Sequence, residues 1–101
     1  MQLKHLAALV ALACSLSAHA ADTKALRIGT DPTYEPFTYK APDGTLMGFD
    51  IDLSKALCAE MKRRCSFVES TWEGLIPSLQ AKKFDLIMSS MTITDQRRKA
   101  V

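Results

Sequence analysis

Three features are scarce in this sequence: a charge excess of one sign, histidine, and apolar runs beyond the first 20 residues. The chain carries 13 Lys or Arg against 11 Asp or Glu, a net charge of +2, too balanced for binding nucleic acid or a membrane surface. Both histidines, His5 and His19, lie in the leader segment described next. No later apolar run is long enough to span a membrane. We therefore expect a soluble protein with no metal, no cofactor and no nucleic-acid partner.

The first 20 residues predict a secretory signal peptide. An apolar run of 11 residues, 6–16, follows a basic start and is too short to cross a bilayer. The pair Ala18-x-Ala20 supplies the small-residue cleavage pattern, which places residues 1–20 in the leader. An alternative is lipid attachment at Cys14, although the residues before it suit such a site poorly.

Removing 20 of 101 residues leaves 81, which is enough for one small α/β unit. Two cysteines remain in this part, Cys58 and Cys65, seven positions apart. In an oxidising compartment such a pair predicts a disulfide, which would stabilise the fold by about 2.5 kcal/mol on the chain-entropy account. Metal binding by the two thiols is the weaker alternative, because no histidine lies nearby.

Three apolar segments predict β-strands, at residues 26–30, 65–69 and 84–88. Between the first two, residues 37–39 and 46–49 flank Pro42-Asp43-Gly44, which is typical of a β-hairpin turn.

Helical patterns separate the strands. The first helix is expected to begin at a capping Asp50 and to face the core with Leu53, Ala56, Leu57 and Met61. The second is expected to open at residues 71–74, to bury Leu75, Ile76 and Leu79, and to end in the basic segment 80–83. Alternating strands and helices predict an α/β fold with a mostly parallel sheet.

Polar and aromatic residues follow each strand. Because ligands of parallel sheets bind beyond the carboxyl ends of the strands, these residues are candidates for one site. They are Asp31 and Tyr34, then Trp72, then Ser89, Ser90 and Thr92.

Arg97 completes the candidate site. Its planar guanidinium suits a carboxylate, and the helix start at Thr94 also favours an anion, so the guest should be a small anion or zwitterion. We assign Arg98 and Lys99 to the surface. The helix stops after about two turns without a C-cap, so we expect the chain to be the front part of a longer protein.

Each candidate also has a structural explanation. Asp31 precedes a proline and could only form a turn, and the serine pair could only end a strand. Tyr34 and Trp72 could be packing residues, and Arg97 lies in a basic run typical of a solvated helix face. Their shared position at strand ends favours a site.

Four separated motifs carry a specific resemblance to a known family. They are residues 27–31, 48–53 and 75–79, and the pattern Ser-Ser-x-Thr-Ile-Thr-Asp-x-Arg at 89–97. The sequence resembles the periplasmic lysine/arginine/ornithine-binding and histidine-binding proteins of ABC amino-acid importers, in solute-binding protein family 3. The resemblance covers essentially all of residues 21–101 and includes the cysteine pair.

The resemblance implies a type II periplasmic binding protein fold with two lobes that close over one amino acid. Residues 21–101 would be a partial, truncated first lobe. The expected function is capture of lysine, arginine, ornithine or possibly histidine in the periplasm, without catalysis. The expected partners are the amino acid and an inner-membrane ABC permease, and the protein should be a monomer.

The resemblance also assigns roles to the residues that would meet the ligand backbone. It implies that Arg97 pairs with the α-carboxylate and that Ser90 and Thr92 assist. The family partner of the α-ammonium is an acid in the second lobe, outside this sequence.

For the ligand side chain, the resemblance implies a sandwich between Tyr34 and Trp72. Asp31 would meet the cationic end, and Ser89 would help with a hydroxyl or carbonyl oxygen. A cation against aromatic faces and a carboxylate suits a basic amino acid.

Two other function classes share this fold. One is a secreted cyclohexadienyl-type dehydratase, for which Glu35 and Asp31 are the nearby candidates for acid or base. The other is a ligand-sensing input domain. Fold alone does not separate them from a binding protein.

Overall fold

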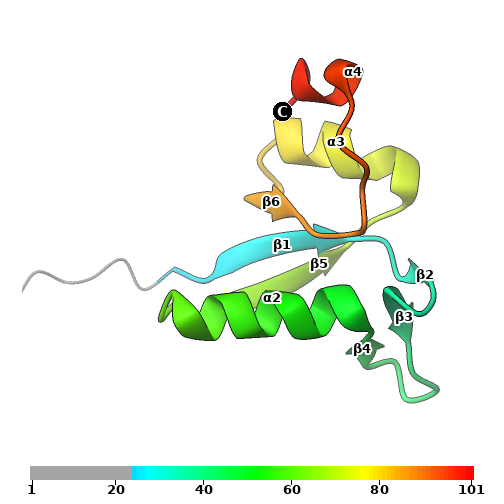
Figure 1. Cartoon of the computed structure of the whole chain (residues 1–101), viewed down its shortest axis with the longest axis vertical. Coiled ribbons are helices and arrows are strands. Elements are labelled where there is room, and N and C mark those ends of the chain that lie inside the picture. The colour runs from blue at the N-terminus through cyan, green and yellow to red at the C-terminus, as the bar shows by residue number, and fades with distance from the viewer. Residues whose placement is uncertain (1–23) are drawn as a thin grey trace, which may run out of the picture.

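A parallel three-stranded sheet lies between two helices in the computed structural model, which describes residues 24–101 (Figure 1). The predicted signal peptide 1–20 and Cys14 therefore lie outside the described residues. The elements in chain order are β1 (Leu26–Thr30), β2 (Thr33–Tyr34), β3 (Thr38–Lys40), β4 (Leu46–Met47), α2 (Phe49–Glu60), β5 (Cys65–Glu69), α3 (Trp72–Gln80), β6 (Leu86–Ile87) and α4 (Asp95–Arg98).

The main sheet has the order β5-β1-β6 and both pairs of strands are parallel, as the sequence predicts. β1 is central, and Ile28 pairs with Phe67 on one side and Leu86 on the other. β6 is shorter than the predicted strand at 84–88. The backbone N–H of Met88 nevertheless donates to the Gly29 carbonyl at 3.0 Å, so the chain stays beside β1 past the end of β6.

A second sheet, β2-β3-β4, is antiparallel and contains the predicted hairpin. Gly44 has φ +85° at the turn, a conformation that favours glycine. The sequence does not predict β2, a two-residue strand that leads from β1 into the hairpin. An ion pair of 2.9 Å between Lys40 Nζ and Glu69 Oε1 joins the hairpin to the end of β5.

Asp50 is not the N-cap of α2, contrary to the sequence prediction. The cap position is Gly48, without a side-chain hydrogen bond, and Asp50 lies in the first turn. Its carboxylate accepts hydrogen bonds from distant hydroxyl groups instead, so it is not available to cap the helix.

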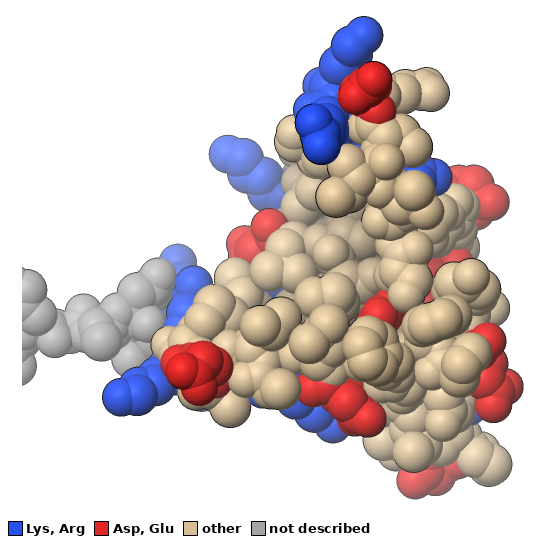
Figure 2. All heavy atoms as spheres, in the orientation of Figure 1, with Lys and Arg blue, Asp and Glu red and all other residues tan. Residues whose placement is uncertain are grey.

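The predicted core face of α2 is also wrong. The helix buries Ile51, Ser54 and Cys58 together with Asp50. Leu53, Ala56, Leu57 and Met61 are all exposed, and Figure 2 shows a largely uncharged surface over α2.

The disulfide prediction is confirmed, and the α3 prediction is confirmed in part, because Ile76 and Leu79 are only half-buried and the helix ends at Gln80, before the basic residues. Thr71 caps α3 by accepting from the Gly74 N–H, and Leu75 is fully buried at its centre. Cys58 and Cys65 form a disulfide that joins α2 to β5.

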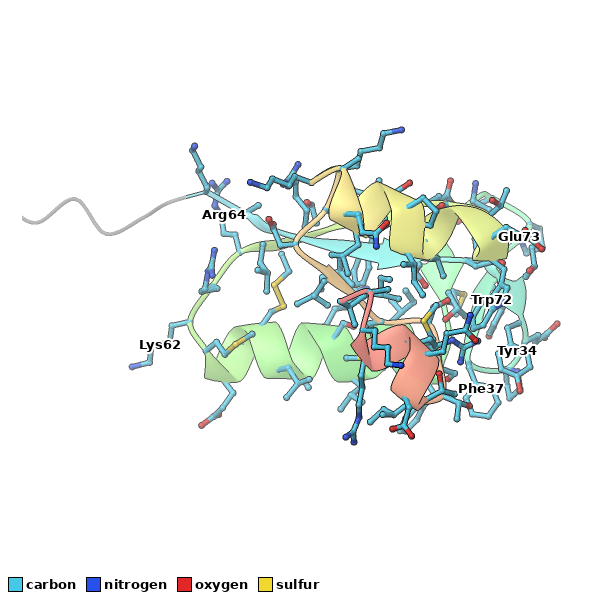
Figure 3. All side chains as sticks on the ribbon, turned by 90° about the horizontal axis from the view of Figure 1, so that it is seen from above. Tyr34, Phe37, Lys62, Arg64, Trp72 and Glu73 are labelled. Atoms are coloured by element: carbon cyan, nitrogen blue, oxygen red, sulfur yellow. A yellow bond between two sulfur atoms is a disulfide. The ribbon has the colours of Figure 1, made fainter. Side chains whose placement is uncertain are left out.

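α2 and α3 lie on opposite faces of the sheet, one below and one above it in Figure 1 and again on either side of it in Figure 3. Buried Ile28, Ile51, Leu75 and Phe84 fill the space between these layers. No helix within residues 24–101 is long and apolar enough to cross a membrane.

Candidate functional site

One pocket of about 390 Å³ contains every residue predicted for the site. It lies where the strands of the main sheet end and is completed by the start of α3 and by α4. Its volume falls within the range of small-molecule sites, roughly 300–1,000 Å³. The lining residues are Asp31, Thr33, Tyr34, Trp72, Ser89, Ser90, Thr92 and Arg97.

Asp31 both forms a turn and faces the pocket. Its Oδ1 accepts from the Thr33 N–H at 3.0 Å and from the Thr33 hydroxyl at 2.7 Å. The second oxygen, Oδ2, has no hydrogen bond within residues 24–101. The side chain is nearly buried, so the turn holds one oxygen in place and leaves the other for a cationic guest.

Ser89 holds the backbone of Asp31 through a hydrogen bond. Its hydroxyl oxygen accepts from the backbone N–H of Asp31 at 2.9 Å, and only 2% of the residue is exposed. The hydroxyl of Thr30, also buried, lies 3.5 Å from the same oxygen. The end of β1 and the segment after β6 are therefore joined directly below the pocket.

Arg97 is a half-buried pocket residue, unlike its neighbour Arg98, which is exposed. Its Nη1 donates to the Thr92 carbonyl at 2.7 Å, and its guanidinium carbon lies 5.5 Å from the centre of the Trp72 ring. Nε and Nη2 have no hydrogen bond within the described chain. Two donors of a restrained fork therefore remain for a carboxylate.

The start of α4 contributes less than the sequence suggests. α4 has only four residues, and its N-cap Thr94 accepts from the Arg97 backbone N–H through Oγ1 at 3.1 Å. This N–H is therefore already bonded within the protein, and the Arg97 side chain is the charged donor that this element places on the pocket.

Tyr34 and Trp72 lie at the end of the molecule opposite Lys62 and Arg64, as the labels of Figure 3 show. Tyr34 is 52% exposed and Trp72 is 38% exposed, so neither is a core residue. Tyr34 leans on Phe37, with 5.1 Å between the ring centres, and Trp72 is in contact with Arg97. Both rings can therefore cover the apolar or cationic part of a guest.

Ser90 has an unusual backbone, with φ +50° in a residue that is not glycine. Its hydroxyl donates to Oδ2 of Asp50 at 2.8 Å, across 40 positions of sequence. Asp50 itself does not line the pocket and only 4% of it is exposed.

Sequence reasoning missed two contributors, Thr33 and Asp50. Thr33 could have been found from the spacing Asp31-x-Thr33, because an aspartate commonly accepts from the residue two positions on. Asp50 carried no local signal, because its hydroxyl partners Thr38 and Ser90 lie 12 and 40 residues away.

The arrangement provides opposite charges at two places in one pocket. Asp31 can accept from a cation, Arg97 can donate to a carboxylate, and two aromatic rings flank them. Within residues 24–101 no cluster of three or more His, Cys, Asp or Glu side chains is placed to hold a metal ion. The geometry suits a small zwitterion that carries an additional positive charge.

Sequence comparison gives the same family that the motifs suggest. Residues 26–101 match the bacterial extracellular solute-binding proteins, family 3. The chain is 53% identical over 102 residues to the L-arginine-binding protein of Pseudomonas aeruginosa, covering 98% of this chain and 39% of that protein. It is 49% identical over 96 residues to the histidine-binding periplasmic protein of Salmonella typhimurium, with coverages of 95% and 37%.

Solved structures of amino-acid-binding proteins are also similar to this chain. A reconstructed ancestral amino-acid-binding protein, described as a precursor of cyclohexadienyl dehydratase, has a TM-score of 0.70 and 53% identity, and the match covers 74% of this chain and 33% of that one. A variant of domain 1 from TmArgBP in its arginine-bound form has a TM-score of 0.70 and 42% identity, with coverages of 73% and 57%.

The structural neighbours are type II periplasmic binding proteins, which confirms the predicted fold class. The chain spans less than two fifths of the length of the two curated relatives described above. The family match nevertheless covers most of the chain. The chain belongs to family 3 of the bacterial extracellular solute-binding proteins.

Proposed function

We propose that residues 21–101 are most of the first lobe of a periplasmic protein that captures a basic amino acid, with lysine, arginine, ornithine or histidine as the candidates. One observation carries the proposal: Asp31 and Arg97 line the same pocket with Tyr34 and Trp72. A basic amino acid has a carboxylate for the arginine, a distal cation for the aspartate and a stem for the rings.

The backbone of the amino acid binds at the Arg97 side of the pocket. Nε and Nη2 of Arg97 donate to the α-carboxylate, and the segment containing Ser90 and Thr92 adds polar contacts. The contact to Trp72 and the bond to the Thr92 carbonyl hold the guanidinium before the ligand arrives, which lowers the entropy cost of binding.

The side chain of the amino acid binds at the Asp31 side. Tyr34 and Trp72 enclose the stem, and Asp31 Oδ2 accepts from the cationic end. Ser89 acts indirectly, by fixing the backbone of Asp31. Burying the cation beside a carboxylate that is already oriented gives selectivity for charge over neutral amino acids.

The names of the relatives support this proposal. One is called an L-arginine-binding protein and another a histidine-binding periplasmic protein. One solved neighbour is described as a mutant of the arginine-bound form of domain 1 from TmArgBP, which supports amino-acid binding by a single domain. Full retention would follow closure of a second lobe, and the closed monomer would then deliver its ligand to an inner-membrane ABC permease. The proposal includes export to the periplasm by the signal peptide 1–20.

The decisive experiment is a titration of the chain with arginine, lysine, ornithine, histidine and glutamine. Amide NMR spectra are recorded at each step of the titration. The spectra report folding and detect weak binding in one measurement. We expect saturable shifts at the pocket residues for the cationic amino acids and much weaker ones for glutamine. Glutamine binding as tightly as arginine would contradict the role of Asp31.

The same titration is repeated on a chimera in which this chain replaces the matching part of the P. aeruginosa relative. The chimera restores a second lobe, so failure to bind any amino acid there would overturn the binding-protein proposal.

A dehydratase is the alternative, because one close structural neighbour is described as a precursor of cyclohexadienyl dehydratase. Such an enzyme needs an acid or base near the carboxylate clamp, and Glu35 and Asp31 are the candidates on this chain. The chimera is mixed with a prephenate-like acid and the absorbance is monitored. Release of an aromatic product would favour the enzyme over the binding protein.

A further inference from the structure

We infer that Asp50 is a positioning residue that sets the hydrogen-bond polarity of Ser90 in the ligand pocket. Its carboxylate binds the single hydroxyl proton of Ser90, so that Ser90 offers only acceptor lone pairs to a guest. The inference rests on the proposed function, because it concerns how the same pocket recognises its ligand.

Asp50 is held in place by three parts of the chain. Its backbone N–H donates to the Phe37 carbonyl at 2.9 Å, and its own carbonyl accepts from the Ser54 hydroxyl at 2.7 Å. Its Oδ2 lies 3.4 Å from the Thr38 hydroxyl and 2.8 Å from the Ser90 hydroxyl. With 4% of the residue exposed, the carboxylate has little room to turn toward water.

Ser90 has an uncommon backbone conformation that the bond to Asp50 helps to hold. A serine with φ +50° adopts a backbone that L-residues rarely occupy, and it persists only where surrounding contacts hold it. The bond to Asp50 is the only hydrogen bond of the Ser90 side chain within residues 24–101. Asp50 therefore fixes both the backbone of this pocket segment and the direction of the hydroxyl.

The number of hydroxyl protons determines whether Ser90 donates or accepts a hydrogen bond in the pocket. A serine hydroxyl has one proton to donate and two lone pairs to accept with. A carboxylate can only accept, so the proton of Ser90 points to Asp50 and the lone pairs remain for the pocket. Arg97, also on the pocket, can only donate. The two side chains thus present opposite hydrogen-bonding character to the guest.

The test compares Asp50→Asn with Ser90→Ala and the double variant. An asparagine can accept or donate, so it releases the fixed direction of the Ser90 hydroxyl while keeping the size of the side chain. We expect Asp50→Asn to weaken arginine binding by about tenfold. If Asp50 acts through Ser90, the double variant binds no more weakly than Ser90→Ala, whereas independent effects would multiply.

A second readout needs no ligand. The carbon chemical shifts of Ser90 report whether its backbone keeps the positive φ, and we expect them to move toward ordinary values in Asp50→Asn. Asp52→Asn is the matched control, because Asp52 lies in the same turn of α2 but is exposed and does not line the pocket. It should leave both the Ser90 shifts and the affinity unchanged.

The outcomes separate this inference from the proposed function. If the chimera with unmodified Asp50 binds no amino acid, the proposed function fails, and the Ser90 shifts still decide whether Asp50 holds the segment. If it binds and Asp50→Asn is indistinguishable from it, only the inference is overturned. Should Asp50→Asn fail to fold, Ser90→Gly keeps the left-handed backbone accessible without the hydroxyl, and unchanged affinity in that variant would refute the inference.

Discussion

Arg97 and Arg98 are adjacent arginines with different surroundings. Arg97 is half-buried, is bonded to the Thr92 carbonyl and lies against the Trp72 ring, whereas Arg98 is exposed and outside the site pocket. Composition alone presents them as one basic run. The difference arises because a helix turns about 100° per residue, so neighbouring side chains face different directions.

Substitution of the two arginines should therefore affect ligand binding differently. Arg97→Ala should weaken binding of a basic amino acid by at least about tenfold, because hydrogen bonds to charged groups contribute roughly 1.5–3 kcal/mol. Arg98→Ala should bind as the unmodified chain does. Both are measured by NMR titration or by calorimetry on the chimera. Equal affinities for the two variants, with the fold intact in each, would remove Arg97 from the site.

Most pocket residues could be predicted from the sequence, for a simple reason. Asp31, Ser89 and Trp72 each follow a strand or begin the helix after one, and parallel strands bring their carboxyl ends together. Asp50 could not be predicted, because its contact to Ser90 depends on how α2 packs beneath the segment after β6. Contacts set by packing leave no periodic signal in the sequence.

At the scale of elements, the buried face of α2 shows where sequence patterns mislead. Leu53 and Leu57 have the helical spacing of a core stripe, yet both are exposed. The buried side contains Ser54, whose hydroxyl bonds to the Asp50 carbonyl, and Cys58, which the disulfide ties to β5. A satisfied hydroxyl and a cross-linked thiol can be buried as readily as leucine, but a hydrophobicity pattern counts only the leucines.

Opposite faces of α2 should therefore respond differently to substitution. Ile51→Ala removes a side chain that is 1% exposed and should lower the free energy of unfolding by about 2–4 kcal/mol. Leu57→Ala, on the exposed face, should change it by less than about 0.5 kcal/mol. Urea denaturation of the two variants measures both values. A large loss for Leu57→Ala with none for Ile51→Ala would show that the other face of α2 packs on the sheet.

Arg27 joins β1 to the chain just before β6 and makes this connection sensitive to acid. Its backbone N–H donates to Asp85 Oδ2 at 2.8 Å, and its Nη2 donates to Oδ1 at 3.1 Å. These bonds, first from the guanidinium and then from the backbone N–H, hold the pKa of Asp85 below its ordinary value, and the same pairing raises the pKa of Arg27. Both groups are exposed, so salt screens the pair and its effect is modest.

The Arg27–Asp85 pair should make the folded state less stable in acid. A carboxyl with a lowered pKa in the folded state stabilises the fold above its unfolded pKa, about 3.9, and this contribution disappears as the pH falls through the folded value. The urea midpoint should therefore decline less steeply below about pH 4 in Asp85→Asn than in the unmodified chain. Arg27→Gln should flatten the decline in the same way, since it removes the donor. Identical slopes in all three proteins would mean that the pair adds nothing to stability.

At the scale of the whole molecule, the pocket collects residues from both ends of the described chain. Asp31 directly follows β1, and Arg97 lies four residues before Val101. A ligand that contacts both side chains would link the end of β1 to α4, in addition to contacts within the protein such as the Gln80 side chain of α3 donating to the Ala100 carbonyl. Binding should therefore stabilise the complete fold.

Ligand binding should therefore raise the unfolding temperature of the protein. A ligand that binds only the folded state stabilises it by RT ln(1 + [L]/Kd), about 2.7 kcal/mol at a hundred times Kd. For a domain of this size, about 1 kcal/mol raises the unfolding temperature by roughly 4–8 °C, so arginine at that concentration should raise it by about 10–20 °C. Circular dichroism melts over a series of arginine concentrations measure the shift. Agmatine, which keeps the guanidinium but lacks the carboxylate, should raise the temperature much less, because it cannot engage Arg97. An equal shift from agmatine, or an undiminished shift in Arg97→Ala, would mean that arginine stabilises the chain without using the carboxylate clamp.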